Sequence, residues 1–283
     1  MIKLVITDLD DTLYPWLSFF VPAFYAMAEE VAAIVGEDLK TVLAEYKEIH
    51  QRIGTVEAPF TTLLLPSVKR AFPNLSEEQQ IERLDPAFHR FNHERKYRLR
   101  LFPGVRKMLE DLRSSGITIV GYTESITENV AFRLGQLEID SFFSRIYVSD
   151  SQNRKNDDSK IYKKTTIVHG KKPNSNVLKQ IIANENCTID EAVYLGDSLT
   201  KDIYMAKQLG ITAILFCDPE PLDAELYRKL VAISSWSTTD FENESRIRNE
   251  CIQRAICPDY TITNALELMK IINLINGRDI NGN

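Results

Sequence analysis

Cysteine and histidine are scarce in this chain, and their spacing offers no obvious metal site. The 283 residues include four cysteines, none of them in a C-x-x-C pair, so zinc ribbons and disulfide frameworks are poorly supported. The four histidines contain one helical pair, His89 and His93, without the acidic partner of an H-E-x-x-H motif. We therefore expect buried or idle thiols and solvated imidazoles rather than zinc ligands.

An excess of positive charge and a long apolar run are also missing. The net charge of −6 argues against a general nucleic-acid binder, because such proteins present basic surfaces. No apolar run approaches the roughly 20 residues of a membrane span, and Met1-Ile2-Lys3 leads into a short run without the features of a secretory signal. We expect a cytoplasmic globular protein, monomeric or homodimeric, with no nucleic-acid or membrane partner.

Two carboxylates stand two residues apart directly after the first apolar run. Asp8 and Asp10 follow Leu4-Val5-Ile6, and residues i and i+2 of a strand share a face, so the two charges should repel each other. Mg²⁺ would relieve the repulsion, since it is held by one or two carboxylates plus phosphate oxygens. One carboxylate could also act as a nucleophile while the other moves a proton. The alternative is a simple turn, because Asp10-Asp11-Thr12 is good turn chemistry.

A second polar segment follows the apolar run that begins at Ile117. The run ends at Thr123, and Ser125 with Glu128 has the spacing of a capping box that opens a helix. Thr123 would then offer its hydroxyl beside free backbone N–H groups at a helix N-terminus, where anions bind. The segment predicts a phosphate-binding hydroxyl.

Two further segments supply a cation and more carboxylates. Lys171 and Lys172 precede the helical pattern that begins at Val177, and a lysine there gives a compact positive charge for a phosphate. Further on, a strand-like run ends in Gly196-Asp197, and Asp202 follows in a turn or first helical turn. Two adjacent lysines on a loop are ordinarily solvated, so each segment is weak evidence by itself.

Taken in order, the four segments resemble the signature motifs of the haloacid dehalogenase superfamily of phosphohydrolases. The resemblance implies that Asp8 is the nucleophile and Asp10 the general acid/base, and that Thr123 and Lys172 bind phosphate. It also implies Mg²⁺ held by Asp8, Asp197 and the backbone carbonyl of Asp10. The positions it assigns to supporting roles are Thr12, Glu124 and Asp202.

The chain departs from the family pattern in two places. Asp11 replaces the glycine most common in the first motif, a substitution frequent among members of this type. The polar stretch before the lysine motif, residues 149–171, is longer than usual. It leaves Lys171 as an alternative to Lys172, with weaker candidates at Lys160, Lys163 and Lys164. Retention of Asp10 favours phosphate chemistry, because the metal-free dehalogenases of this family lack an aspartate there.

Strand-like runs alternate with helical patterns through most of the chain, which predicts a doubly wound, Rossmann-like parallel sheet with helices on both faces. Ligands in such sheets bind beyond the carboxyl ends of the strands, where Asp8, Thr123 and Asp197 fall. The predicted strands are Lys3–Thr7, Thr118–Tyr122, Arg145–Ser149, Ala192–Leu195, Thr212–Phe216 and Tyr260–Ile262.

Residues 14–99 differ from the alternating pattern. Their apolar residues recur at three- and four-residue steps, which predicts an all-helical insert. We expect a discontinuous core, residues 1–13 and 100–283, and a helical cap over residues 14–99, the position of the substrate-selecting lid in the family. Residues 218–256 form a further insertion, which could pack on the core, shape the site mouth or mediate oligomer contacts. The candidate substrate contacts near the hinges are Tyr14, Trp16, Arg98 and Arg100.

The sequence therefore predicts a Mg²⁺-dependent phosphatase that hydrolyses a small phosphorylated metabolite through an aspartyl-phosphate on Asp8. A phosphotransferase or mutase and a metal-free dehalogenase of the same fold are alternatives. A binding module with vestigial chemistry is another, although the intact set of motif residues argues against it. No motif in the helical insert identifies the metabolite.

Overall fold

The protein is described by a computed structural model over residues 1–150, 160–220 and 222–277. It divides into two compact units. One, the core unit, comprises Met1–Pro15, Arg100–Pro221 and Glu244–Asn283. The other, the helical unit, comprises Trp16–Leu99 and Leu222–Asn243. Each unit is considered by itself below.

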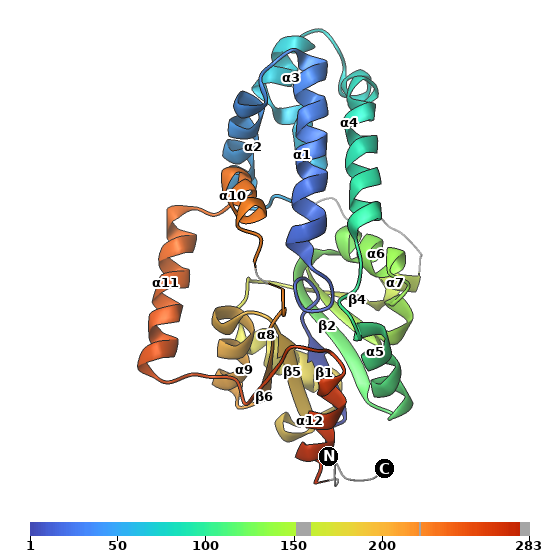
Figure 1. The fold of residues 1–283 in the computed structure, drawn as a ribbon, viewed down its shortest axis with the longest axis vertical. Helices are drawn as coiled ribbons and strands as arrows, with labels where there is room; N and C mark the ends of the chain where they lie inside the picture. Colours follow the sequence, from blue (N-terminus) through green and yellow to red (C-terminus); the bar gives the residue numbers. More distant parts are fainter. Residues whose placement is uncertain (151–159, 221, 278–283) are drawn as a thin grey trace. The chain divides into compact units, whose positions relative to one another are not determined.

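The core unit is built on a parallel sheet of seven strands in the order β4-β3-β2-β1-β5-β6-β7 (Figure 1). This arrangement confirms the predicted α/β fold class. The six predicted strands are present, and the additional strand β4 lies at one edge. The strands are β1 (Leu4–Thr7), β2 (Thr118–Ile126), β3 (Arg145–Ser149), β4 (Thr165–Val168), β5 (Ala192–Gly196), β6 (Thr212–Phe216) and β7 (Tyr260–Ile262).

Strand β1 lies at the centre of the sheet, and the direction of winding reverses beside it. All four of its residues are buried, as expected for a strand covered on both faces. Ile6 is in register with Val120 of β2 on one side and with Tyr194 of β5 on the other. The chain continues outward from β2 to β4 and then returns to β5, so the carboxyl ends of β1, β2 and β5 meet at the switch point where such sheets bind ligands.

Helices cover both faces of this sheet. Leu4, Ile6 and their strand neighbours pack with α8 and α9 on one face, and the alternate residues, such as Val5, point to the other face, where α5 and α12 pack together (Figure 1). The helices of the core unit are α5 (Val105–Ser114), α6 (Thr127–Gln136), α7 (Lys160–Lys164), α8 (Ser175–Asn184), α9 (Tyr204–Leu209) and α12 (Glu267–Ile275), with the short turns η2 (Asp140–Phe142), η3 (Ile189–Glu191) and η4 (Leu199–Ile203).

The helical unit contains the insert predicted from the sequence. Helices α1 and α4 pack side by side, and an aromatic cluster of Phe24, Tyr46 and His50 joins α1 to α2. Ser76 and Gln79 form a capping box at the start of α4. The elements are α1 (Trp16–Val35), α2 (Leu39–Ile53), η1 (Pro59–Leu64), α3 (Pro66–Ala71), α4 (Glu77–Arg98) and α10 (Ala224–Ile233).

Helix α1 corrects one expectation from the sequence. Its 20 residues are long and apolar enough, by length and composition, to pass as a membrane span. Half of its most apolar window is nevertheless buried inside the protein, where it packs against α4. A buried core helix passes the same test, so α1 is weak evidence for a membrane segment.

The division into units differs from the expected boundaries in the second insertion. The sequence-based boundaries place residues 222–243 in the core, whereas the structure groups them with the helical unit. Three backbone carbonyls explain this: Lys229 O accepts from the Tyr25 hydroxyl at 3.1 Å, and Ile233 O and Trp236 O accept from side chains of α2. Helix α10 is thereby tied to α1 and α2.

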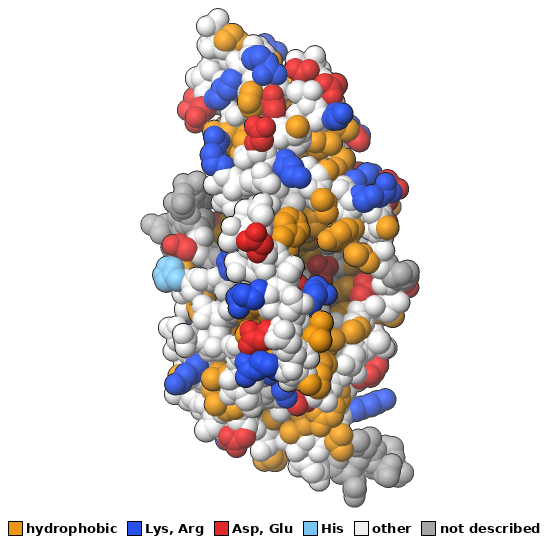
Figure 2. All heavy atoms as spheres, turned by 90° about the vertical axis from the view of Figure 1, so that its left-hand side faces the viewer, with side chains coloured by type: hydrophobic (Ala, Val, Ile, Leu, Met, Phe, Trp, Pro, Cys, Tyr) orange, Lys and Arg blue, Asp and Glu red, His pale blue; other side chains and the backbone are white. Residues whose placement is uncertain are grey.

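Helix α11 (Thr238–Gln253) crosses from one unit to the other, since the boundary falls after Asn243. Its later residues belong to the core, where Ile247 and Cys251 pack against Tyr204 of α9. Arg248 and Arg254 form i,i+4 ion pairs along it with Glu244 and Glu250. On the face that Figure 2 shows, acidic and basic side chains of the described residues are interspersed rather than gathered by sign.

Candidate active site

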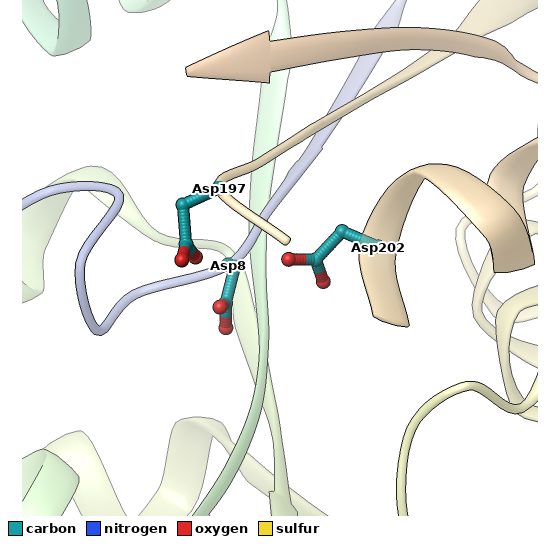
Figure 3. Close-up of side chains that lie close together, drawn as sticks. All are labelled: Asp8, Asp197 and Asp202. Carbon is teal, nitrogen blue, oxygen red and sulfur yellow. The ribbon is translucent and has the colours of Figure 1, made fainter. Parts of the chain in front are cut away.

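Three aspartates, two from strand ends and one from a helical turn, converge at the switch point of the sheet. Asp8 follows β1 and Asp197 follows β5, and the backbone N–H of Asp8 donates to Leu195 O at 2.8 Å, which joins the two ends. Asp202 reaches the same place from the π-helical turn η4 (Figure 3). Carboxylate oxygens of Asp8, Asp197 and Asp202 all lie within 4.8 Å of one another.

Lys172 is the cation of this cluster. Its Nζ lies 2.8 Å from Oδ1 of Asp8 and 2.9 Å from Oδ1 of Asp202, and its side chain is 2% exposed. The ammonium group also lies over the rings of Tyr122 and Tyr194, 4.8 and 5.7 Å from their centroids. A lysine held by two carboxylates and two aromatic faces has a fixed position.

The other lysines considered from the sequence are elsewhere. Lys171 is exposed. Lys164 donates to the backbone carbonyl of Asp140 at 3.0 Å. Lys163 belongs to α7, and the side chain of Lys160 lies outside the described residues. The structure therefore brings Lys172, of these candidates, to the carboxylates.

Both carboxylate oxygens of Asp202 accept hydrogen bonds. Oδ1 accepts from Lys172 and from the Tyr194 hydroxyl at 2.8 Å, and Oδ2 accepts from the backbone N–H of Ser198 at 3.1 Å. Gly196 makes this approach possible, because a Cβ there would lie 2.5 Å from Cγ of Asp202. Asp202 thus holds the lysine and the turn together.

Burial makes the negative charges of this cluster costly. Burial, followed by the charge of Asp202, raises the pKa of Asp197 to about 7. Burial also raises the pKa of Asp8 well above its ordinary value. Burial lowers the pKa of Lys172, but the charges of Asp202 and Asp8 outweigh it, and the net pKa of Lys172 is raised. Three carboxylates thus surround one ammonium group, an excess of negative charge that a bound cation would relieve.

The side chain of Asp10 is held by a different group of residues. Arg133 Nη1 lies 2.8 and 3.0 Å from the two carboxylate oxygens of Asp10. The Ser125 hydroxyl donates to Oδ2 at 2.9 Å. Tyr14 is nearby: burial first, and then the charge of Asp10, raise its pKa well above the usual value. No sequence motif indicated Arg133 as a partner of Asp10. It lies on α6 between the buried residues Val130 and Leu134.

The capping box expected at Ser125 and Glu128 is wrong. Strand β2 continues to Ile126 after a break in its register, and α6 begins at Thr127 without a side-chain cap. The Ser125 hydroxyl instead donates to Oδ2 of Asp10. Thr123 is buried in β2, where its Oγ1 accepts from the N–H of Ser125 at 3.0 Å. It precedes the first residue of α6, Thr127, by four positions.

Glu124 links three of the predicted motifs. Its Oε1 accepts from the backbone N–H of Lys172 at 3.1 Å, and its Oε2 accepts from Nζ of Lys201 at 2.5 Å. Thr12 connects the first motif to the last, since its hydroxyl donates to Oδ1 of Asp197 at 3.2 Å. Glu124 and Thr12 therefore connect segments that lie far apart in the sequence.

Asp11, the departure from the family pattern, adopts a left-handed backbone with φ of 55°. Glycine adopts this conformation without strain, and aspartate is among the few other residues that tolerate it. The turn closes through the N–H of Asp11, which donates to Tyr14 O at 2.9 Å. The geometry explains why either residue type serves here.

The four candidate substrate contacts have varied surroundings. Tyr14 is buried in the core unit, and Arg100 is exposed there. In the helical unit, Trp16 stacks on Phe20 and donates its indole N–H to Glu57, and Arg98 pairs with Glu94 at 2.9 Å. Their roles toward a substrate remain predictions.

Comparisons with known proteins bear on the family of this chain. The sequence model of the haloacid dehalogenase-like hydrolases matches residues 2–210. A protein of Pyrococcus abyssi named glyceraldehyde 3-phosphate phosphatase is 28% identical over 218 residues, 76% of this chain and 82% of the relative. A protein of the same name from Methanopyrus kandleri is 28% identical over 222 residues, 76% of this chain and 83% of the relative.

Solved structures share the fold. A haloacid dehalogenase-type phosphatase of Thermococcus onnurineus superposes with a TM-score of 0.55 at 17% identity, over 96% of this chain and 98% of that one. A 2-haloacid dehalogenase of Pseudomonas syringae gives 0.53 at 20% identity, over 97% and 99%. The fold alone thus serves both chemistries. With the family match over most of its length and relatives named as phosphatases, the chain belongs to the haloacid dehalogenase-like hydrolases, as a hydrolase of the phosphatase type.

Proposed function

We propose that the protein is a Mg²⁺-dependent phosphatase that acts on a small phosphorylated metabolite. The observation that carries the proposal is the approach of Asp8, Asp197 and Lys172 at the carboxyl edge of the sheet. The curated relatives named for glyceraldehyde 3-phosphate make that compound the first substrate to test. The chain covers more than four fifths of both relatives, which supports extending their reaction to it.

The proposed reaction has two halves. In the first, an oxygen of Asp8 attacks phosphorus and forms an O–P bond, the bond from phosphorus to the substrate oxygen breaks, and Asp10 gives that oxygen a proton. In the second, water attacks the aspartyl-phosphate and gives its proton to Asp10, so Asp8 and inorganic phosphate are released. Lys172 and Thr123 bind phosphate oxygens, where negative charge gathers in the transition state.

The residues at this edge fit a magnesium ion. The donor set is made of oxygen atoms only, which Mg²⁺ prefers over nitrogen and sulfur. Asp8, Asp197 and the backbone carbonyl of Asp10 would hold the ion, while Asp202 supports Lys172 and the backbone of Ser198. Bound Mg²⁺ would offset negative charge between the nucleophile and the phosphate.

Three other functions compete with this proposal. A mutase or other phosphotransferase would use the same first half-reaction and would need water to be excluded in the second. A metal-free dehalogenase shares the fold, but Asp10 and the excess of carboxylates disfavour it. A binding module would not need Asp8, Lys172 and Asp202 in mutual contact.

Two further expectations are kept as proposals. The helical unit would act as a substrate-selecting cap. The candidate substrate contacts near the hinges are Trp16 and Arg98 of the helical unit and Tyr14 and Arg100 of the core unit. A cytoplasmic location is supported by the cysteines of the described residues, which are all free, as is usual in reducing compartments.

The test is turnover of p-nitrophenyl phosphate and of a metabolite panel that includes glyceraldehyde 3-phosphate, with and without Mg²⁺. We expect hydrolysis that EDTA abolishes and that Mg²⁺ restores, whereas Zn²⁺ should replace it poorly because the ligands are all oxygen. Release of chloride from a 2-haloacid with no phosphate release would establish the dehalogenase. Transfer of label from one sugar phosphate to another, without free phosphate, would establish the mutase.

A further inference from the structure

The carboxylate of Asp10 is anchored in the core unit by a closed triangle of hydrogen bonds. Arg133 Nη1 donates to both oxygens of Asp10, at 2.8 and 3.0 Å, and to the Ser125 hydroxyl at 2.8 Å. Ser125 in turn donates to Oδ2 of Asp10 at 2.9 Å. Each corner of the triangle therefore contacts the other two.

The arginine in this triangle is buried. Its side chain is 4% exposed, whereas that of Asp10 is 23% exposed. A buried guanidinium loses its hydration and is tolerated when a carboxylate and further hydrogen bonds replace the water. Charge-assisted hydrogen bonds of this kind are short and strongly directional. Arg133 thus restricts the orientation of Asp10 while leaving part of that carboxylate accessible.

Two separate cations therefore serve the two predicted catalytic carboxylates. Lys172 lies against Asp8 and Asp202, and Arg133 lies against Asp10. They come from different parts of the fold, because Lys172 precedes α8 and Arg133 belongs to α6. The function proposed above assigns a task to Lys172 and leaves Arg133 without one.

We propose that Arg133, together with Ser125, is the positioning group that orients Asp10 for proton transfer. The inference rests on the proposed phosphatase function. When Asp10 gives its proton to the leaving oxygen, its carboxylate becomes negatively charged, and the neighbouring guanidinium stabilises that charge. The same contacts keep the carboxylate in place to take a proton from the attacking water. Arg133 itself touches neither substrate nor phosphorus.

The experiment compares Arg133→Met and Arg133→Lys with a matched control, Arg106→Met. Arg106 also belongs to the core unit and also ties down α6, through Leu137 O at 2.7 Å and Glu138 O at 3.2 Å. If Arg133 merely stabilises α6, the two methionine variants should behave alike. Ser125→Ala removes the other donor to Asp10 and serves as the second variant should Arg133→Met fail to fold.

The readout is kcat/KM, which reports the first half-reaction alone, for an alkyl phosphate, whose leaving oxygen needs a proton, against kcat/KM for p-nitrophenyl phosphate, whose leaving oxygen does not. We expect Arg133→Met to lower kcat/KM for the alkyl phosphate about 10- to 100-fold, the range seen for residues that orient metal ligands, and kcat/KM for the nitrophenyl ester by much less. Arg133→Lys should recover part of the loss. Ser125→Ala should show the same selectivity with a smaller loss, and Arg106→Met should show none.

A double variant tests whether Arg133 acts through Asp10. In an Asp10→Asn background, adding Arg133→Met should change the alkyl rate less than about threefold, because residues that act as a unit are not additive. Independent, multiplicative losses would overturn the inference, as would equal losses for the two leaving groups. An active wild type with an unaffected Arg133→Met overturns the inference alone, whereas a wild type inactive on every phosphate overturns the proposed function with it.

Discussion

The ammonium nitrogen of Lys172 lies 2.8 Å from Oδ1 of Asp8, and both side chains are largely withdrawn from solvent. The proposed nucleophile is therefore held by the same cation that is proposed to bind the phosphate. Asp202 shares that cation at 2.9 Å, so loss of the charge on Asp8 leaves Lys172 with a carboxylate partner. This arrangement makes the nucleophile replaceable without leaving a buried charge unpaired.

Asp8→Asn should abolish turnover and preserve the fold. The neutral amide cannot form the aspartyl-phosphate, and its introduction removes a carboxylate whose burial raises its pKa well above the ordinary value. We expect the melting temperature at neutral pH to hold or rise. Rates of the purified variant and its melting curve check both statements. Turnover above a few per cent of wild type would show that another residue attacks phosphorus.

The raised pKa of Asp197 predicts how this residue makes the stability of the metal-free protein depend on pH. Its folded-state pKa of about 7 lies above its ordinary value of 3.8, so between these values the folded protein keeps a proton that the unfolded chain has lost. The contribution of Asp197 to the stability should therefore fall as pH rises from about 4 toward 7. Asp197→Asn removes this penalty and should raise stability at pH 8 by on the order of 1 kcal/mol or more, with the gain shrinking near pH 4.

Magnesium separates this electrostatic effect from other effects of the Asp197→Asn substitution. Mg²⁺ should raise the melting temperature of the wild type at pH 8, since a ligand that binds the folded state stabilises it. The same Mg²⁺ should have little effect on Asp197→Asn. Equal stabilisation of both proteins by Mg²⁺ would remove Asp197 from the proposed metal site.

The meeting of Asp8 and Asp197 at one edge of the sheet was predictable because parallel strands place their carboxyl ends together. Asp8 and Asp197 each follow a buried apolar run, and the two runs proved to be neighbouring strands, so the residues lie close despite their separation in the sequence. Lys172 could not be separated from Lys171 in this way. In the structure Lys172 is the buried one of the two. The local sequence does not indicate which of two adjacent lysines will be buried.

Other features depend on contacts that sequence patterns do not encode. Ser125 and Glu128 have capping-box spacing, yet β2 extends to Ile126, and the serine bonds Asp10 instead. Helix α10 joins the helical unit through backbone carbonyls such as Ile233 O, which every residue type possesses. The partner of Arg133 is likewise set by the approach of α6 to the first loop, a tertiary relationship with no periodicity of its own.

A substitution at Gly196 can test whether Asp202 holds Lys172 in place. A methyl group there would lie 2.5 Å from Cγ of Asp202, so Gly196→Ala must displace the carboxylate that holds Lys172. We expect a stability loss of about 1–3 kcal/mol and a lower kcat/KM for every phosphate ester. Melting curves and kinetics measure the two effects.

Gly135 in α6 is the matched control for Gly196→Ala. Nothing lies within 4 Å of the position a Cβ would take there, so Gly135→Ala should be tolerated or stabilise the helix by roughly 0.5–1 kcal/mol. A Gly196→Ala protein as active and stable as the Gly135→Ala protein would show that Asp202 can move without consequence.

The hydrogen bond between His50 of α2 and α10 predicts how the attachment of α10 to α2 depends on pH. The imidazole is fully buried, and its Nδ1 lies 2.7 Å from Ile233 O, so Nδ1 bears the proton that the carbonyl accepts. Nε2 is buried without a hydrogen-bond partner among the described residues. A second proton on the ring would therefore be buried without an acceptor, and burial lowers the pKa of His50 despite the opposing bond to Ile233.

The lowered pKa fixes the sign of the pH dependence. As pH falls below about 6.5, the ordinary histidine value, the unfolded chain takes up a proton before the folded protein does, so stability present above that pH is lost. His50→Gln keeps a donor without titrating and should remove this loss, so its melting temperature should rise relative to that of the wild type as pH falls from 7 to 5. His89→Gln, at a side chain that is 78% exposed, should leave it unchanged. Hydrogen exchange should localise the acid effect to α10 and the facing turn of α2, and identical pH profiles for wild type and His50→Gln would show that His50 does not control the attachment.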